Sequence, residues 1–140
     1  MGIDDSTESP NGGTVAHILL VEDEADVRES LRSQLEGEGH EVTVTDSGME
    51  ALALVESSKF DIVLTDVMLP DLNGLELVER LKPLPHKPVI VVMTGYGSVE
   101  MAVKAIKAGA FEFLQKPFSV DVLSAMVASA LRVKALHEEN

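Results

Sequence analysis

The stretch DIVLTDVMLPDLNGLELVERLKP, residues 61–83, holds in a short span the alternation that decides the fold. It opens with an apolar run at Ile62–Thr65, which is typical of a buried strand, and Asp66 follows that run directly. Apolar side chains then recur at helical spacing over Gly74–Lys82, and Pro83 ends this helical pattern. The stretch therefore predicts a strand, a short acidic loop and a helix.

The same alternation continues on both sides of this stretch. Four more strands are predicted, at His17–Val21, Glu41–Thr45, Val89–Met93 and Phe111–Gln115. Four more helices are predicted, at Asp26–Glu38, Met49–Val55, Val99–Ala108 and from Ser119 to about His137. Ser98 and Ser119 are the expected N-caps of the last two helices, and Gly39 is expected to stop the first. Strict alternation of strand and helix predicts an α/β fold with a parallel sheet and helices on both faces.

The chemistry of the strands indicates their order. The first, third and fourth strands are continuously apolar, as strands covered on both faces must be. The second and fifth alternate between apolar and polar residues, which suits edge strands. We therefore expect a doubly wound, flavodoxin-like five-stranded sheet in the order 2-1-3-4-5. In that order the topological switch lies between strands one and three, and ligands bind outside their carboxyl ends.

Chemically active side chains follow those carboxyl ends. Glu22 and Asp23 follow the first strand, Asp66 the third, Thr94 the fourth and Lys116 the fifth. Carboxylates held close together repel one another and favour a bound hard cation, for which oxygen-only ligands indicate Mg²⁺. Beside a cation, one carboxylate can act as a nucleophile toward a phosphoryl group. A hydroxyl and an ammonium are the groups that such a phosphoryl group would need around its oxygens.

Each of these residues also has an ordinary structural interpretation. For Asp23, an N-cap of the following helix is about as good an explanation as a site. Asp66 alone suits a turn, Lys116 alone a solvated lysine, and Thr94 alone a hydroxyl that caps a turn. Four such residues at successive strand ends together favour a shared site.

Composition limits the remaining classes of function. The 140 residues include 24 acidic and 11 basic side chains, for a net charge of -13, and 45% are hydrophobic. This charge argues against direct binding to nucleic acid or to an anionic membrane surface. The absence of cysteine excludes disulfides and cysteine-bound zinc, and no apolar run reaches ~18 residues. We expect a disordered leader at 1–15 without signal-peptide features, one domain at 16–137, a tail or the start of a linker at 138–140, and a cytoplasmic location.

Four motifs carry a resemblance to a known family. They are LLVEDE at Leu19–Glu24, DIVLTDVMLPDLNG at Asp61–Gly74, VMTGYG at Val92–Gly97 and KAGAFEFLQKPF at Lys107–Phe118. With them, the chain from His17 to Leu136 resembles the receiver domain of bacterial two-component response regulators. The amino-acid sequence of residues 94–118 is most similar to that of the subgroup whose receivers precede a sigma-54-activating ATPase.

The resemblance implies a role for each site residue. Asp66 would accept a phosphoryl group from a sensor histidine kinase or a small donor such as acetyl phosphate. Mg²⁺ would be held by Asp23, by Asp66, by Glu22 through water and by the backbone carbonyl of Met68. Lys116 would pair with the phosphoryl oxygens.

The resemblance also implies a switch. Thr94 would hydrogen-bond to the phosphoryl group and shift toward it, and Phe113 would follow. The surface of the helix at 99–108, the strand at 111–115 and the last helix would thereby change and control output or formation of a homodimer. The peptide bond before Pro117 would be cis.

The last helix is predicted to carry two adjacent apolar columns, one more than packing on the sheet requires. One runs through Val122, Met126 and Val133, and the other through Leu123, Val127, Ala130 and Leu131. One column would suffice to face the sheet, so the second either faces a partner or packs broadly on the core.

Three rival functions are weaker. An aspartate-nucleophile phosphatase of the haloacid-dehalogenase type needs a second Asp two residues after the first, and Met68 stands there. A constitutive docking module would not need the acidic residues. A flavin site would need a Ser/Thr-rich loop after the first strand, where Glu22 and Asp23 stand instead.

Overall fold

The computed structural model describes residues 15–95 and 97–139. The expected leader at 1–15 lies outside the described residues except for Val15. Strands and helices alternate throughout: β1 (His17–Val21), α1 (Ala25–Gly37), β2 (Glu41–Thr45), α2 (Gly48–Ser57), β3 (Ile62–Asp66), α3 (Gly74–Leu81), β4 (Val89–Thr94), α4 (Val99–Ala108), β5 (Glu112–Gln115) and α5 (Val120–Glu139). The predicted order of elements is confirmed.

The sheet has the strand order β2-β1-β3-β4-β5, and every neighbouring pair is parallel. β1, β3 and β4 occupy the centre and are buried nearly throughout, whereas the edge strands β2 and β5 are partly exposed. The predicted fold class and strand order are therefore confirmed. The register pairs Asp66 with Met93 and Thr94 with Gln115, so the ends of β3, β4 and β5 lie along one rim.

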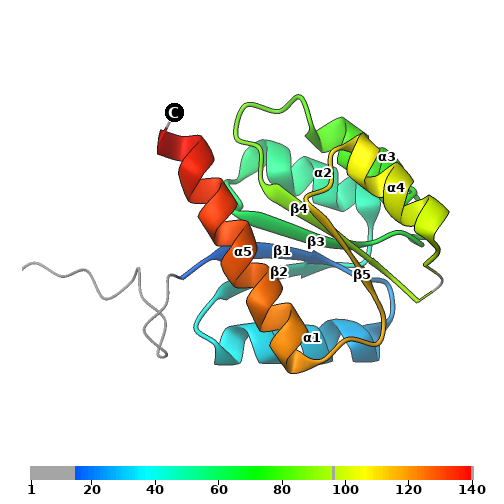
Figure 1. Cartoon of the computed structure of the whole chain (residues 1–140), viewed down its shortest axis with the longest axis horizontal. Coiled ribbons are helices and arrows are strands. Elements are labelled where there is room, and N and C mark those ends of the chain that lie inside the picture. Colours follow the sequence, from blue (N-terminus) through cyan, green and yellow to red (C-terminus); the bar gives the residue numbers. More distant parts are fainter. Residues whose placement is uncertain (1–14, 96, 140) are drawn as a thin grey trace, which may run out of the picture.

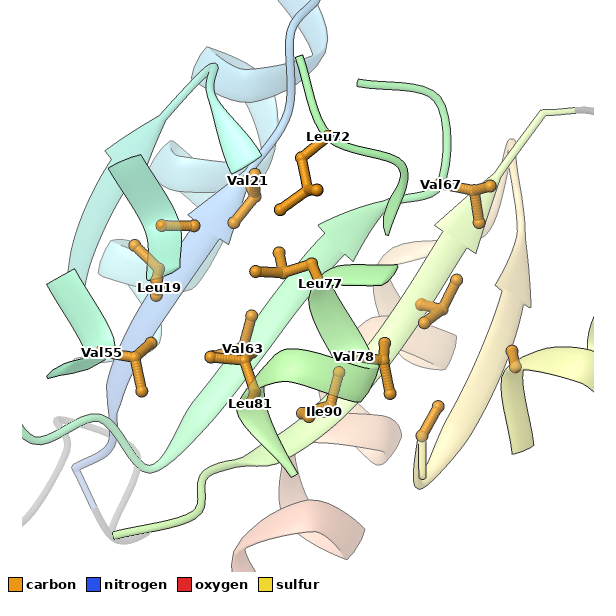
Figure 2. Packing of buried hydrophobic residues seen from close by; sticks show 14 of the residues in the cluster. Leu19, Val21, Val55, Val63, Val67, Leu72, Leu77, Val78, Leu81 and Ile90 are labelled. Atoms are coloured by element: carbon orange, nitrogen blue, oxygen red, sulfur yellow. The ribbon is translucent and has the colours of Figure 1, made fainter. Parts of the chain in front are cut away.

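Side chains of alternate residues in each strand point to opposite faces of the sheet and build two cores. On one face, Leu19 and Val21 of β1 pack with α2, α3 and α4 (Figures 1 and 2). On the other face, Ile18 and Leu20 pack with α1 and α5. A central strand must supply apolar side chains to both layers, which explains the continuous apolar run HILLV.

Local signals in the sequence set the helix boundaries. The Ser98 hydroxyl accepts a hydrogen bond from the Met101 N–H at 3.1 Å, and the Ser119 hydroxyl accepts one from the Val122 N–H at 3.1 Å, so both expected N-caps are confirmed. Gly39 has φ 95° just after α1, a conformation that side chains rarely adopt. α5 continues to Glu139, past its expected end near His137.

The two columns of α5 differ in burial. Leu123, Val127 and Ala130 are buried against the sheet. In the other column, Met126 and Val133 pack partly on the same core, and only Val122, 43% exposed, faces outward. Most of the second column therefore belongs to a broad packing face. Over residues 15–95 and 97–139, no helix combines the length and the hydropathy that crossing a membrane requires.

Candidate functional site: an acidic cluster at the carboxyl ends of the strands

Three carboxylates converge at the rim where β1 and β3 end. One oxygen from each of Glu22, Asp23 and Asp66 lies within 4.8 Å of the other two. Glu22 is 0% exposed and Asp66 4% exposed, whereas Asp23 is open to solvent. The convergence expected from the strand order is present, and it gathers negative charge at a partly buried place.

Lys116, directly after β5, supplies the cation of the cluster. Its Nζ lies 2.7 Å from Glu22 Oε1 and 2.7 Å from Asp66 Oδ2. The peptide bond between Lys116 and Pro117 is cis, as the resemblance implied. One ammonium thus joins the ends of three strands.

The other carboxylate oxygens accept backbone hydrogen bonds. Glu22 Oε2 accepts from the Glu24 N–H at 3.0 Å, and Asp66 Oδ1 accepts from the Met68 N–H at 3.0 Å. Arg28 of α1 donates from Nη1 to the Glu22 carbonyl oxygen at 2.8 Å. These contacts fix both buried carboxylates, since each has a partner at both oxygens.

The pKa directions follow from this geometry. Burial raises the pKa of Glu22, although the hydrogen bond from Lys116 opposes that shift. Burial lowers the pKa of Lys116, but its hydrogen bonds to Asp66 and Glu22 and their charges outweigh burial, so that its pKa is raised overall. Lys116 is therefore firmly cationic.

The charges of the cluster do not balance. Three carboxylates face one ammonium, which leaves two negative charges when all three acids are ionised. A divalent cation would balance that charge, and a set of carboxylate oxygens without histidine or cysteine suits a hard cation. The donor set thus fits Mg²⁺.

An open cavity of about 520 Å³ lies over the cluster. Its lining residues are Asp23, Glu24, Val27, Asp66, Met68, Thr94, Gly95, Lys116 and Pro117. Thr94 is fully buried at the end of β4, and its carbonyl oxygen accepts the Lys116 N–H at 2.8 Å. Asp66, Thr94 and Lys116 therefore all line one cavity.

Phe113 does not line this cavity. Its half-buried ring packs beside Gly97, since a methyl group added at Gly97 would lie 2.9 Å from the ring atoms Cε1 and Cζ. The same methyl group would lie 3.3 Å from Thr94 Cγ2. Gly97 is therefore close to both the cavity residue Thr94 and the ring of Phe113.

The ordinary interpretation of Asp23 as a helix cap is wrong. The N-cap of α1 is Glu24, whose own side chain makes no capping hydrogen bond. Asp66 does take part in a turn, because its Oδ1 accepts the Met68 N–H at 3.0 Å, but its Oδ2 also lies 2.7 Å from Lys116 Nζ, so the turn is only part of its role. Both carboxylates lie in the acidic cluster.

Some residues of the site could not be picked out of the sequence. Arg28 reaches the Glu22 carbonyl oxygen from the first turn of α1, and Val27 of the same turn lines the cavity. Asp71 lies in the loop after β3 and binds the start of α2. The acidic run Glu22–Glu24 indicated the loop after β1 as part of a site, but no sequence pattern marks Arg28 as a partner of Glu22, or Asp71 as a partner of the distant start of α2.

Comparison with known proteins gives a consistent assignment. Residues 18–128 match the family described as response regulator receiver domain. The transcriptional regulatory protein FixJ of Bradyrhizobium diazoefficiens is 41% identical over 119 residues, which cover 85% of this chain and 58% of FixJ. Response regulator protein PilR of Pseudomonas aeruginosa is 39% identical over 116 residues, which cover 83% of this chain and 26% of PilR. The chain thus spans little more than half of the one relative and about a quarter of the other.

A solved structure agrees with both sequence matches. The solution structure of the beryllofluoride-activated NtrC4 receiver domain dimer superposes with a TM-score of 0.80 at 36% identity, covering 84% of this chain and 98% of that one. The matches to PilR and NtrC4 agree with the subgroup that the sequence of residues 94–118 indicated.

Proposed function

The chain belongs to the response regulator receiver domain family, and from that premise we propose that it accepts a phosphoryl group on Asp66 in a magnesium-dependent reaction. The observation that carries the proposal is the contact of Lys116 Nζ with both Glu22 and Asp66, at 2.7 Å each, under an open cavity. The arrangement supports the proposal because carboxylates and an ammonium lie together, and these are the groups that a nucleophile, metal ligands and a partner for phosphoryl oxygens require.

The proposed metal ligands are Asp23, Asp66, Glu22 through water and the backbone carbonyl of Met68. Support comes from the closeness of the three carboxylates, of which one oxygen each lies within 4.8 Å of the other two, and from their unbalanced negative charge. When bound, Mg²⁺ would neutralise charge on the phosphoryl oxygens during transfer. Asp23 is the exposed member of the cluster, so it is the carboxylate that solvent-borne ions reach first.

In the proposed reaction, a carboxylate oxygen of Asp66 attacks the phosphorus of a phosphohistidine on a sensor histidine kinase, or of acetyl phosphate. The new bond is P–O to Asp66, and the bond that breaks is P–N to the histidine or P–O to the acetate. Lys116 pairs with a phosphoryl oxygen, and the Thr94 hydroxyl donates a hydrogen bond to another. Water later hydrolyses the resulting acyl phosphate.

The proposed output is a change at the surface of α4, β5 and α5. Thr94 and Phe113 both contact the position of Gly97, so a shift of Thr94 toward the phosphoryl group frees space for the ring. On α4, Val99, Val103 and Ile106 lie at helical spacing and are exposed, Val99 by 83%. Such an apolar stripe suits a partner or a second copy of the chain, and we propose a homodimer on phosphorylation.

The setting follows from the same family. We propose that the chain acts in a two-component system that regulates transcription, with a sensor kinase as its partner and without direct contact to nucleic acid. A cytoplasmic location suits a chain whose 140 residues contain no cysteine.

The test is the mass of the intact protein after incubation with acetyl phosphate and Mg²⁺. We expect one phosphoryl group on the wild type, none with EDTA present and none on Asp66→Asn. Asp121→Asn makes the same chemical change at an exposed position of α5 and should behave as wild type. A wild type that gains no phosphoryl group and binds no beryllofluoride with Mg²⁺ would contradict the proposal and leave a docking module.

A further inference from the structure

Asp71, in the loop between β3 and α3, binds the first turn of another helix. Its Oδ2 accepts the Ser47 hydroxyl at 2.7 Å and the Met49 N–H at 3.0 Å, and its Oδ1 accepts the Gly48 N–H at 2.9 Å. Residues 47–49 begin α2, where free N–H groups and the helix dipole favour a carboxylate. The hydrogen bonds from Ser47, Met49 and Gly48 lower the pKa of Asp71 to about 2, so the anchor is charged under ordinary conditions.

The loop touches α2 through its backbone as well. A methyl group added at Gly48 would lie 2.9 Å from Leu72 Cβ and 3.1 Å from the Leu72 carbonyl oxygen. Leu72 is itself buried in the core shared by α2 and α3 (Figure 2). The loop and the start of α2 therefore leave no room for a side chain between them.

The anchored loop is the one that carries Met68. Its base is closed by the hydrogen bond from the Gly74 N–H to the Val67 carbonyl oxygen at 2.8 Å. Near this base, the Met68 N–H donates to Asp66 Oδ1 at 3.0 Å. With the base fixed at β3 and Asp71 fixed on α2, the path of the Met68 backbone is held at two points.

The same loop borders the acidic cluster on its open side. An open cavity of about 450 Å³ lies between Asp23 and the loop, and its lining residues are Asp23, Val67, Met68, Leu69, Pro70, Asp71, Leu72 and Asn73. A loop that came away from α2 would change this side of the site, whereas β1 and β3 would stay in the sheet.

We propose that Asp71 is a positioning residue: by pinning the β3–α3 loop to α2, it holds the Met68 backbone beside Asp23 and Asp66 and so sets the affinity of the site for a divalent cation. This inference rests on the proposed function, because it needs the cluster to bind Mg²⁺. It adds that a carboxylate outside the cluster, and not in contact with the cation, controls binding.

The test is Mg²⁺ binding by calorimetry, together with amide hydrogen exchange of the metal-free protein. Asp71→Ala should weaken Mg²⁺ binding about tenfold, the size of effect seen when residues supporting metal ligands are removed. Asp71→Asn keeps one acceptor oxygen and should lie between Asp71→Ala and wild type. Without metal, the amides of Gly48, Met49 and Met68 should exchange faster in Asp71→Ala.

Two controls separate positioning from loss of charge or of stability. Glu76→Gln removes an exposed carboxylate of α3 and should leave the Mg²⁺ affinity unchanged. Val55→Ala lowers the stability of α2 from its buried side, away from the loop, and should also leave the affinity unchanged. If Asp71→Ala does not fold, Asp71→Asn carries the comparison, because Ser47→Ala would also remove the hydrogen bond from the Glu50 N–H that caps α2.

The possible outcomes separate the claim about Asp71 from the proposed function. Wild-type Mg²⁺ affinity in Asp71→Ala, with faster exchange at Gly48 and Met49, would reduce Asp71 to a cap of α2 and overturn the inference alone. A wild-type protein that binds no Mg²⁺ would overturn the proposed function and the inference together.

Discussion

Gly74 lies directly against the backbone of Asp66. A methyl group added at Gly74 would come within 2.3 Å of the Asp66 carbonyl oxygen and 2.7 Å of Val67 Cα. The first residue of α3 therefore has to be glycine, because no side chain fits between it and the backbone of β3. This close packing holds the end of β3, which carries Asp66, in place.

This relationship makes Gly74→Ala a destabilising change. The methyl group meets backbone atoms that belong to β3 and cannot yield, so we expect a loss of about 1–3 kcal/mol in the free energy of unfolding. Gly37→Ala is the matched control, because no atom lies within 4 Å of an added methyl group there. It should be stabilising by about 0.5–1 kcal/mol, since alanine suits a helix better. Urea denaturation of both variants measures this, and a Gly74→Ala protein as stable as wild type would be contrary to the described packing.

Lys116→Ala should destabilise the protein without metal. Glu22 is 0% exposed, and without the ammonium its charge has no cationic partner in the acidic cluster. We expect a loss of about 2 kcal/mol in EDTA, partly recovered by Mg²⁺. Lys104→Ala, at an exposed position of α4, should stay within about 0.5 kcal/mol of wild type. If the two variants were equally stable in EDTA, the contacts of Lys116 would contribute nothing to the free energy of unfolding.

Asp23→Asn should have the opposite effect in EDTA. It removes one of three neighbouring carboxylates and so relieves repulsion, which should raise Tm by about 2–4 °C. The rise in Tm that Mg²⁺ causes in wild type should shrink in this variant. Glu56→Gln, an exposed acid at the end of α2, provides the control for a change of net charge. A lower Tm for Asp23→Asn in EDTA would show that the cluster is not under repulsion.

His40 should make stability depend on pH. Its Nδ1 accepts the Ala16 N–H at 3.0 Å, which only an unprotonated Nδ1 can do. Burial lowers the pKa of His40, with the Glu38 carboxylate opposing the shift. A lowered pKa in the folded state means that its stabilising contribution is present above the unfolded value of 6.5 and is lost as pH falls through the folded value.

The measurement is urea denaturation at about pH 7.5 and about pH 5. The loss of stability on acidification should be smaller in His40→Gln, which cannot titrate and whose amide oxygen can accept the same N–H. His86→Gln, at an exposed position before β4, should keep the wild-type loss. An unchanged loss in His40→Gln would remove His40 as its source.

The parts of the site that the sequence predicted depend on topology alone. Glu22, Asp23 and Asp66 could be placed together because parallel strands present their carboxyl ends at one rim, and the strand order followed from which runs were continuously apolar. The same logic brought Lys116 to this rim, where it contacts Glu22 and Asp66.

The parts that the sequence did not predict depend on close approach between distant segments. Asp71 binds α2 only because Gly48 and Leu72 meet without a side chain between them, and no local pattern encodes that distance. Arg28 lies near Glu22 in the sequence, yet its contact with the Glu22 carbonyl oxygen depends on the position of a long side chain, which no sequence pattern specifies. Helix ends were missed by one or two residues, as for α2, because caps such as Ser47 act just outside the apolar pattern that was used to find them.

The measurement that tests the account most directly is the position of the phosphoryl group on the chain. Borohydride reduces an acyl phosphate to an alcohol, so treatment of the phosphorylated protein marks the accepting carboxylate, and peptide mass mapping then finds it. We expect one reduced carboxylate, that of Asp66, and none when EDTA is present during phosphorylation. A mark on Asp23 or on any other carboxylate, or a mark on Asp66 that forms equally well with EDTA, would contradict this expectation.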